Sequence, residues 1–146
     1  MPVVGDDGTL YLDSEDVLAA YAAVFGCSSG QAADQLRSIA ALEGALARPV
    51  QHAHYSGADL ALQAAVLAEG IAETQPFIDG NKRVALAVMR AFLLANGYTV
   101  TASQAERAAW LLELSGSLTA AELAAKVRDA MRPVGGTVAP GDIDTV

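Results

Sequence analysis

The segment Ala58–Gly97 holds two strongly apolar stretches separated by a polar turn: ADLALQAAVLAEGIAETQPFIDGNKRVALAVMRAFLLANG. The first stretch predicts a helix over 58–74, which Pro76 ends because the residue before a proline avoids the helical conformation. A second helix is expected to start near Asn81 and to stop at Asn96–Gly97, a common C-terminal signal. Both helices have continuous apolar faces, so we expect them to form the centre of the core.

Further helices are expected on both sides of this segment. Asp13 is a suitable N-cap for a helix that Gly26 ends, since acidic residues favour the first turn. The remaining expectations are helices over 31–47, 103–114 and 119–132, a loop over 50–57 after Pro49, and extended pieces over 1–11 and 98–101. The predicted fold class is all-α, a compact single-domain bundle of about six helices over residues 1–132. A flexible C-terminal tail over 133–146 is expected because this part is rich in glycine and proline.

Composition and charge narrow the classes of function. The chain has 146 residues, of which 53% are hydrophobic and 18% charged, and this fits one globular domain. Its net charge of −8 disfavours direct nucleic-acid binding and acidic membrane surfaces. The single Cys27 excludes an internal disulfide and a cysteine-rich zinc site. We see no secretory signal or membrane span, so a cytoplasmic location is expected.

The polar turn Gln75–Arg83 (QPFIDGNKR) is the candidate site. Free backbone N–H groups at a helix N-terminus bind anions, above all phosphate, and a preceding glycine lets the backbone turn closely. Lys82 and Arg83 lie in the first turn, where a bound anion would compensate their charge. Asp79 is suited to a divalent metal that bridges phosphates. Arg90 either reaches phosphate or forms a salt bridge.

An ordinary turn is the alternative interpretation of the same residues. Asp79 would then cap the helix, and Lys82 and Arg83 would lie in solvent.

The turn resembles the signature of the Fic/Doc family, His-x-Phe-x-Asp/Glu-Gly-Asn-x-Arg. Phe77, Asp79, Gly80, Asn81 and Arg83 match in register. Lys82 matches the form typical of the Doc (death-on-curing) branch, and so does the absence of a second arginine at Leu86. The flanks Leu12–Tyr21, Leu42–Pro49 and Phe92–Tyr98 also resemble the family, so the similarity covers about residues 10–132.

The resemblance implies an enzyme that uses ATP or another nucleoside triphosphate with Mg²⁺. Doc-like members are kinases that transfer the terminal phosphate to a target protein, elongation factor Tu, while most Fic members transfer AMP (AMPylation). By position, Asp79 would ligate Mg²⁺, Gly80 and Asn81 would form the nucleotide cradle, and Lys82 and Arg83 would hold phosphate oxygens. Phe77 would be a buried anchor. The implied partner is the antitoxin protein of a toxin–antitoxin system, bound as a helix in a groove over the motif cleft.

The chain departs from the signature at the position of the catalytic histidine, where it has Gln75. Glutamine does not titrate and cannot act as the general base, a role typically worth about 10²–10⁴ in rate. Three explanations stay open: a change introduced to make a toxic protein expressible, a natural feature of a degenerate or reused fold, and a base supplied from elsewhere. His52 and His54 are the candidates for that last role, with exposed loop histidines as the alternative.

The sequence therefore predicts a Doc-like toxin with phosphoryl transfer impaired at Gln75. Two alternatives remain: a non-catalytic nucleotide-binding or partner-binding pseudo-enzyme, and a Fic-type AMP transferase. A helical enzyme whose cleft serves small molecules also remains open.

Overall fold

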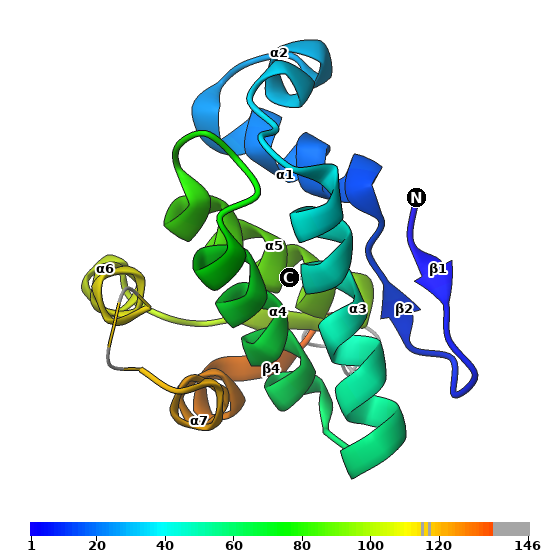
Figure 1. Cartoon of the computed structure of the whole chain (residues 1–146). Coiled ribbons are helices and arrows are strands. Elements are labelled where there is room, and N and C mark those ends of the chain that lie inside the picture. The colour runs from blue at the N-terminus through cyan, green and yellow to red at the C-terminus, as the bar shows by residue number, and fades with distance from the viewer. Residues whose placement is uncertain (115, 117, 136–146) are drawn as a thin grey trace.

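The computed structural model describes residues 1–114, 116 and 118–135, and these form a helical bundle with two small two-stranded sheets (Figure 1). In chain order the helices are α1 (Ser14–Phe25), α2 (Ser29–Asp34), α3 (Ile39–Ser56), α4 (Leu60–Thr74), α5 (Asn81–Ala95), α6 (Gln104–Glu113) and α7 (Ala120–Ala130). The strands are β1 (Val3–Val4), β2 (Leu10–Tyr11), β3 (Tyr98–Val100) and β4 (Met131–Pro133). The predicted all-α fold class is confirmed, with seven helices in the described residues in place of about six.

Helix α4 is the central element, as its sequence predicts. It packs against α3, α5 and α7, and most of its side chains are buried. Small residues make this possible: a Cβ at Gly70 would lie 3.1 Å from the Cβ of Ala45 on α3. Helix α5 contributes a second buried row that includes Val84, Val88 and Phe92. The close approach of α3 to α4 therefore depends on glycine and alanine, while larger side chains of α5 fill the core.

The helix ends follow the sequence signals closely. Asp13 caps α1 in a reciprocal capping box with Asp16, and Gly26 ends the helix in the left-handed conformation. Asp59 caps α4 and also accepts two hydrogen bonds from Arg128 of α7, at 2.8 and 3.0 Å. These bonds hold the pKa of the Asp59 carboxyl below its ordinary value and join the start of α4 to α7.

The predictions for residues 31–57 are wrong in two respects. The expected single helix is divided into α2 and α3, because Ser38 caps a new helix start. The expected loop over 50–57 is helical, and α3 continues through Pro49 to a left-handed Gly57. The apolar row Leu42, Ala45, Pro49 keeps helical spacing and is buried, so packing compensates the backbone hydrogen bond that proline cannot donate.

The predicted extended pieces form three of the four strands, β1, β2 and β3. The fourth was not predicted: the helix expected to reach residue 132 ends at Ala130, and Met131–Pro133 form β4, because they pair with β3. Strands β1 and β2 make an antiparallel hairpin, and β3 pairs with β4 at the end of α7. The amide of Asn96, the predicted stop of α5, binds both backbone groups of Leu10 at 2.8 and 2.9 Å and so fastens the hairpin to α5. The expected tail from Pro133 begins within β4, and its residues 136–146 lie outside the described residues. No helix in the described part of the chain is long and apolar enough to cross a membrane.

Gln63 is the buried polar side chain of the described core. Its Oε1 accepts a hydrogen bond of 2.8 Å from the Tyr11 hydroxyl, and its Nε2 donates to the Ala58 carbonyl at 2.9 Å. Burial raises the pKa of Tyr11, so the hydroxyl stays protonated and donates at neutral pH. This bond joins β2 to α4.

Tyr11→Phe is expected to lower the free energy of unfolding by about 1–3 kcal/mol, because Gln63 Oε1 would stay buried without a donor. Chemical denaturation followed by circular dichroism measures the change. Tyr98→Phe is the matched control, since Tyr98 is half-buried and its hydroxyl makes no hydrogen bond within the described residues. Equal losses in the two variants would show that the Tyr11 hydroxyl has no special role.

Candidate functional site

The loop between α4 and α5 is anchored by Phe77, which is only 1% exposed. Its ring stacks on Tyr21 of α1 at a centroid distance of 4.5 Å. The backbone on either side pairs with the segment before α3: Pro76 O accepts from Arg37 N at 2.7 Å, and Ile78 N donates to Gln35 O at 2.8 Å. The expected buried role of Phe77 agrees with this position. The loop is therefore held from two sides, by α1 and by residues 35–38.

The side chain of Asn81 closes the loop on itself. Its Oδ1 accepts from Phe77 N at 2.9 Å, and its Nδ2 donates to Phe77 O at 3.0 Å. The amide expected in the nucleotide cradle thus fixes the backbone of the loop itself. Sequence analysis did not foresee this use of Asn81.

Gly80 is the N-cap of α5 and lies in the left-handed region, with φ 77°, and no side chain of the described residues caps the helix. Asp79 instead accepts a hydrogen bond of 2.8 Å from Gly80 N, so it does not cap α5 as the ordinary-turn alternative expects. The other part of that alternative, exposed side chains at Lys82 and Arg83, agrees with the structure. A Cβ at Gly80 would collide with the ring of Phe25, whose Cε2 atom would lie 2.8 Å away. Within the part of the chain that the structure describes, the N–H groups of the first turn of α5 have no side-chain acceptor. This is the condition in which a helix N-terminus binds an anion.

The candidate site residues meet in one cleft of about 410 Å³. Its lining includes all six residues singled out in the sequence: Gln75, Asp79, Gly80, Asn81, Lys82 and Arg83. Leu111 and Leu112 of α6 form part of the opposite wall. The structure thus brings these six residues together in one cleft.

Lys82 and Arg83 are the cations of the cleft, and both are exposed. Within the described residues neither has a carboxylate within 4 Å, whereas Arg48 pairs with Glu73 at 3.3 Å. Arg83 lies over the ring of Phe25, 4.7 Å from its centroid. Two uncompensated cations at the positive end of a helix favour an anionic ligand.

Gln75 is the C-cap of α4 and the one non-glycine residue of the described chain with positive φ, at 50°. Such a conformation typically costs about 1–3 kcal/mol. Arg37 compensates the end of α4, because its guanidinium donates to the carbonyls of Thr74 and Gln75. No motif in the sequence marks Arg37, because it is distant in sequence from the carbonyls it binds.

His52 and His54 lie in α3 rather than in a loop, and both are exposed. The rings of His54 and Tyr55 pack in a T-shaped arrangement, with their centroids 4.7 Å apart. Neither histidine lines the motif cleft. The described residues contain no group of three histidine, cysteine or acidic side chains able to hold a metal. The structure therefore does not bring these histidines to the candidate site.

The cleft fits a Mg²⁺ ion that a protein carboxylate and phosphate oxygens would coordinate together. Asp79 is exposed in the cleft, and one of its carboxylate oxygens stays free of protein hydrogen bonds within the described residues. Mg²⁺ is usually held by one or two carboxylates together with substrate phosphates and water. One carboxylate beside two cations and a helix N-terminus matches that pattern.

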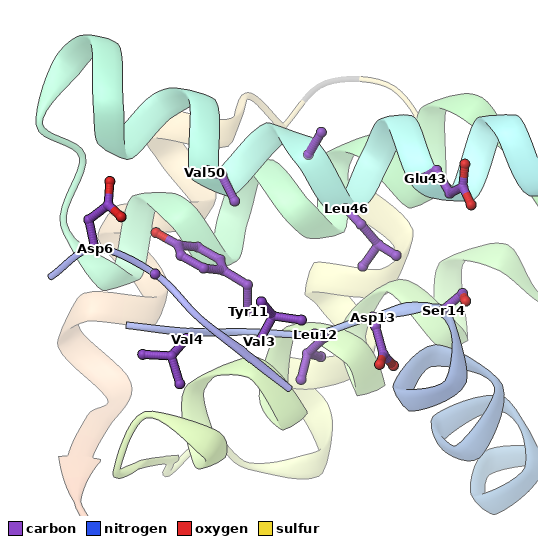
Figure 2. A pocket seen from close by; sticks show the side chains of 12 residues that line it. Val3, Val4, Asp6, Tyr11, Leu12, Asp13, Ser14, Glu43, Leu46 and Val50 are labelled. Atoms are coloured by element: carbon purple, nitrogen blue, oxygen red, sulfur yellow. The ribbon is translucent and has the colours of Figure 1, made fainter. Parts of the chain in front are cut away.

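A larger hollow of about 510 Å³ lies between the hairpin and α3 (Figure 2). Val3, Val4, Leu46 and Val50 give it an apolar floor, with Glu43 beside them. None of the six candidate site residues lines it. Size alone would select this hollow, but no lysine or arginine lines it. The helix N-terminus in its lining, that of α1, is already capped by Asp13.

Comparison with known proteins agrees with the motif. The model of the Fic/DOC family matches residues 11–93, which include the loop, all of α4 and α5 as far as Leu93. The chain is also 39% identical over 98 residues to a toxin Doc of Mycolicibacterium smegmatis, an alignment that covers 64% of this chain and 70% of that protein. The resemblance inferred from the sequence is confirmed.

Gly80→Ala is expected to destabilise the protein by about 1–3 kcal/mol, because alanine is strained at this φ and its Cβ would collide with Phe25. Gly44→Ala is the control, since Gly44 lies in α3 with open space around its Cβ. That change is expected to stabilise the helix by up to about 1 kcal/mol. Urea denaturation of both variants measures the difference, and a Gly80→Ala variant as stable as wild type would disprove the steric argument.

Proposed function

The chain belongs to the Fic/DOC family, in its Doc branch, and from this we propose that it is the toxin of a toxin–antitoxin pair. Its proposed chemistry is the transfer of the terminal phosphoryl group of a nucleoside triphosphate to a Ser or Thr hydroxyl of a target protein. Elongation factor Tu is the target that the family resemblance favours. The proposed location is the cytoplasm, where nucleotide and target meet.

One observation carries this proposal: the six motif residues line a single cleft at an uncapped helix N-terminus. The backbone N–H groups of the first turn of α5 would bind phosphate oxygens, as the N–H groups at helix N-termini do in other phosphate sites. Lys82 and Arg83 would hold further phosphate oxygens and stabilise the charge that develops during transfer. Asn81 would act through the loop, since its amide is bound to the backbone of Phe77.

Asp79 is the proposed ligand of Mg²⁺. When bound, the ion would supply charge neutralisation between the phosphates. The hydrogen bond from Gly80 N to Asp79 Oδ1 keeps this carboxylate beside the helix N-terminus. Asp79 thus belongs to the proposed catalytic group even though it does not cap α5.

Gln75 limits the proposed reaction. Its backbone is fixed by Arg37, and its side chain makes no hydrogen bond within the described residues. A neutral amide donates and accepts hydrogen bonds but takes up no proton from an attacking hydroxyl. We therefore expect nucleotide binding to persist while transfer is slow.

The antitoxin is the proposed protein partner, by analogy with the toxin Doc relative. A helical segment of it is proposed to cover the motif cleft, where Leu111 of α6 supplies an apolar wall.

A non-catalytic nucleotide-binding module is the second candidate, and Gln75 is the observation that favours it. AMP transfer is the third, and Leu86 argues against it, because this position holds a second arginine in the AMP-transferring relatives.

Labelling with ATP tests the proposal. Wild-type protein and Gln75→His are incubated with a bacterial lysate and with purified elongation factor Tu, using ATP labelled at the γ or the α phosphate. Phosphoryl transfer predicts γ label only, with about 10²–10⁴ more transfer by Gln75→His. Label from the α position would establish AMP transfer instead.

Gln75→Asn is the matched control. Asparagine and histidine both tolerate the left-handed backbone better than most residues, but only histidine titrates near neutral pH. The Gln75→Asn variant should therefore stay as inactive as wild type. If neither variant labels a protein while both are folded and bind Mg²⁺–ATP, the binding-module function replaces the toxin kinase.

A further inference from the structure

A second groove lies next to the motif cleft, between α5 and α6, with a volume of about 380 Å³. It shares Arg83 and Leu111 with that cleft. Its walls combine apolar side chains with three arginines, and the lining residues are Val24, Arg83, Leu86, Ala87, Met89, Arg90, Gln104, Arg107, Ala108, Trp110 and Leu111. No aspartate or glutamate is among them.

The three arginines stand out against the charge of the chain. The net charge is −8, with nine lysines and arginines in all. Within the described residues the side chains of Arg83, Arg90 and Arg107 have no salt bridge or hydrogen bond, and Arg83 lies over the ring of Phe25. The salt bridge expected as one alternative for Arg90 is not formed within the described residues. Uncompensated like charges along one groove cost free energy unless an anionic partner meets them.

The spacing of the cations favours an extended partner over a single small anion. Arg83 and Arg90 are seven positions apart on α5, which places them on one face about 10 Å apart along the axis. Arg107 approaches from α6, on the other side of the groove. Between them Leu86 and Leu111, both half-buried, offer apolar surface. A nucleic acid would also meet the cations, but the overall negative charge repels it.

We propose that this groove docks an acidic amphipathic segment of a partner protein, with carboxylates about two helical turns apart beside an apolar stripe. The carboxylates pair with Arg90, Arg107 and Arg83, while the apolar stripe packs on Leu86 and Leu111. Because Arg83 belongs to both hollows, such a segment ends beside the motif cleft. The inference depends on the groove alone and not on phosphoryl transfer.

Trp110 provides the readout, since it is the chain's one tryptophan and lines the groove. The full chain is titrated with a synthetic amphipathic helix that carries glutamates seven positions apart beside a leucine stripe. The control peptide has glutamine at each glutamate. The acidic peptide is expected to change the fluorescence of Trp110 and to bind more weakly as salt increases, while the control binds poorly.

Two matched double variants distinguish the effect of the charges in the groove from the effect of the net charge of the protein. The double variant Arg90→Gln/Arg107→Gln is expected to weaken binding about tenfold, as the loss of two exposed ion pairs implies. Lys126→Gln/Arg132→Gln removes the same two charges from exposed positions of α7 and β4 and should bind like wild type. Circular dichroism melting verifies that both variants fold.

Several results would overturn the proposal. One is equal binding of the two peptides, and another is equal weakening by the two double variants. A lack of any fluorescence change at millimolar acidic peptide would also reject it. If inorganic triphosphate alone binds with the same dependence on Arg90 and Arg107, the groove is a small-polyanion site instead of a docking surface for protein.

Discussion

Everything in the candidate site depends on the fixation of one short loop by Phe77 and Asn81. The buried ring of Phe77 places the loop on α1. The side-chain amide of Asn81 binds the backbone N–H and carbonyl of Phe77 and so ties the loop to the start of α5. These contacts leave the first turn of α5 uncapped and turned toward the cleft. A helix N-terminus acts as an anion site only if the preceding backbone does not block it. Here Phe77 and Asn81 hold the preceding backbone away from the helix end.

Much of the fold follows from local signals. Apolar periodicity predicts α4 and α5 as the core, and the caps at Asp13 and Gly26 lie where the sequence places them. The break before α3 and the helix beyond Pro49 could not be predicted in this way. Both depend on contacts distant in sequence: residues 35–38 pair with the motif loop, and Pro49 is buried in a continuous apolar row.

In the candidate site, too, some features can be predicted from the sequence and others depend on contacts between distant segments. The motif predicts which residues share the cleft, because their spacing around a turn fixes their neighbourhood. It does not predict that Asn81 serves the loop backbone or that Arg37 holds the end of α4. Charge composition also gives no sign that Arg83, Arg90 and Arg107 converge on one groove, since convergence depends on how α5 and α6 pack.

The backbone at Gln75 has a consequence for how the chain can change. A left-handed C-cap accepts few residue types without strain, and histidine suits it better than glutamine does. The codons of these two amino acids differ by a single nucleotide in the third position. Both the genetic code and the backbone of this loop therefore permit histidine at position 75, and a single nucleotide change would restore the full signature.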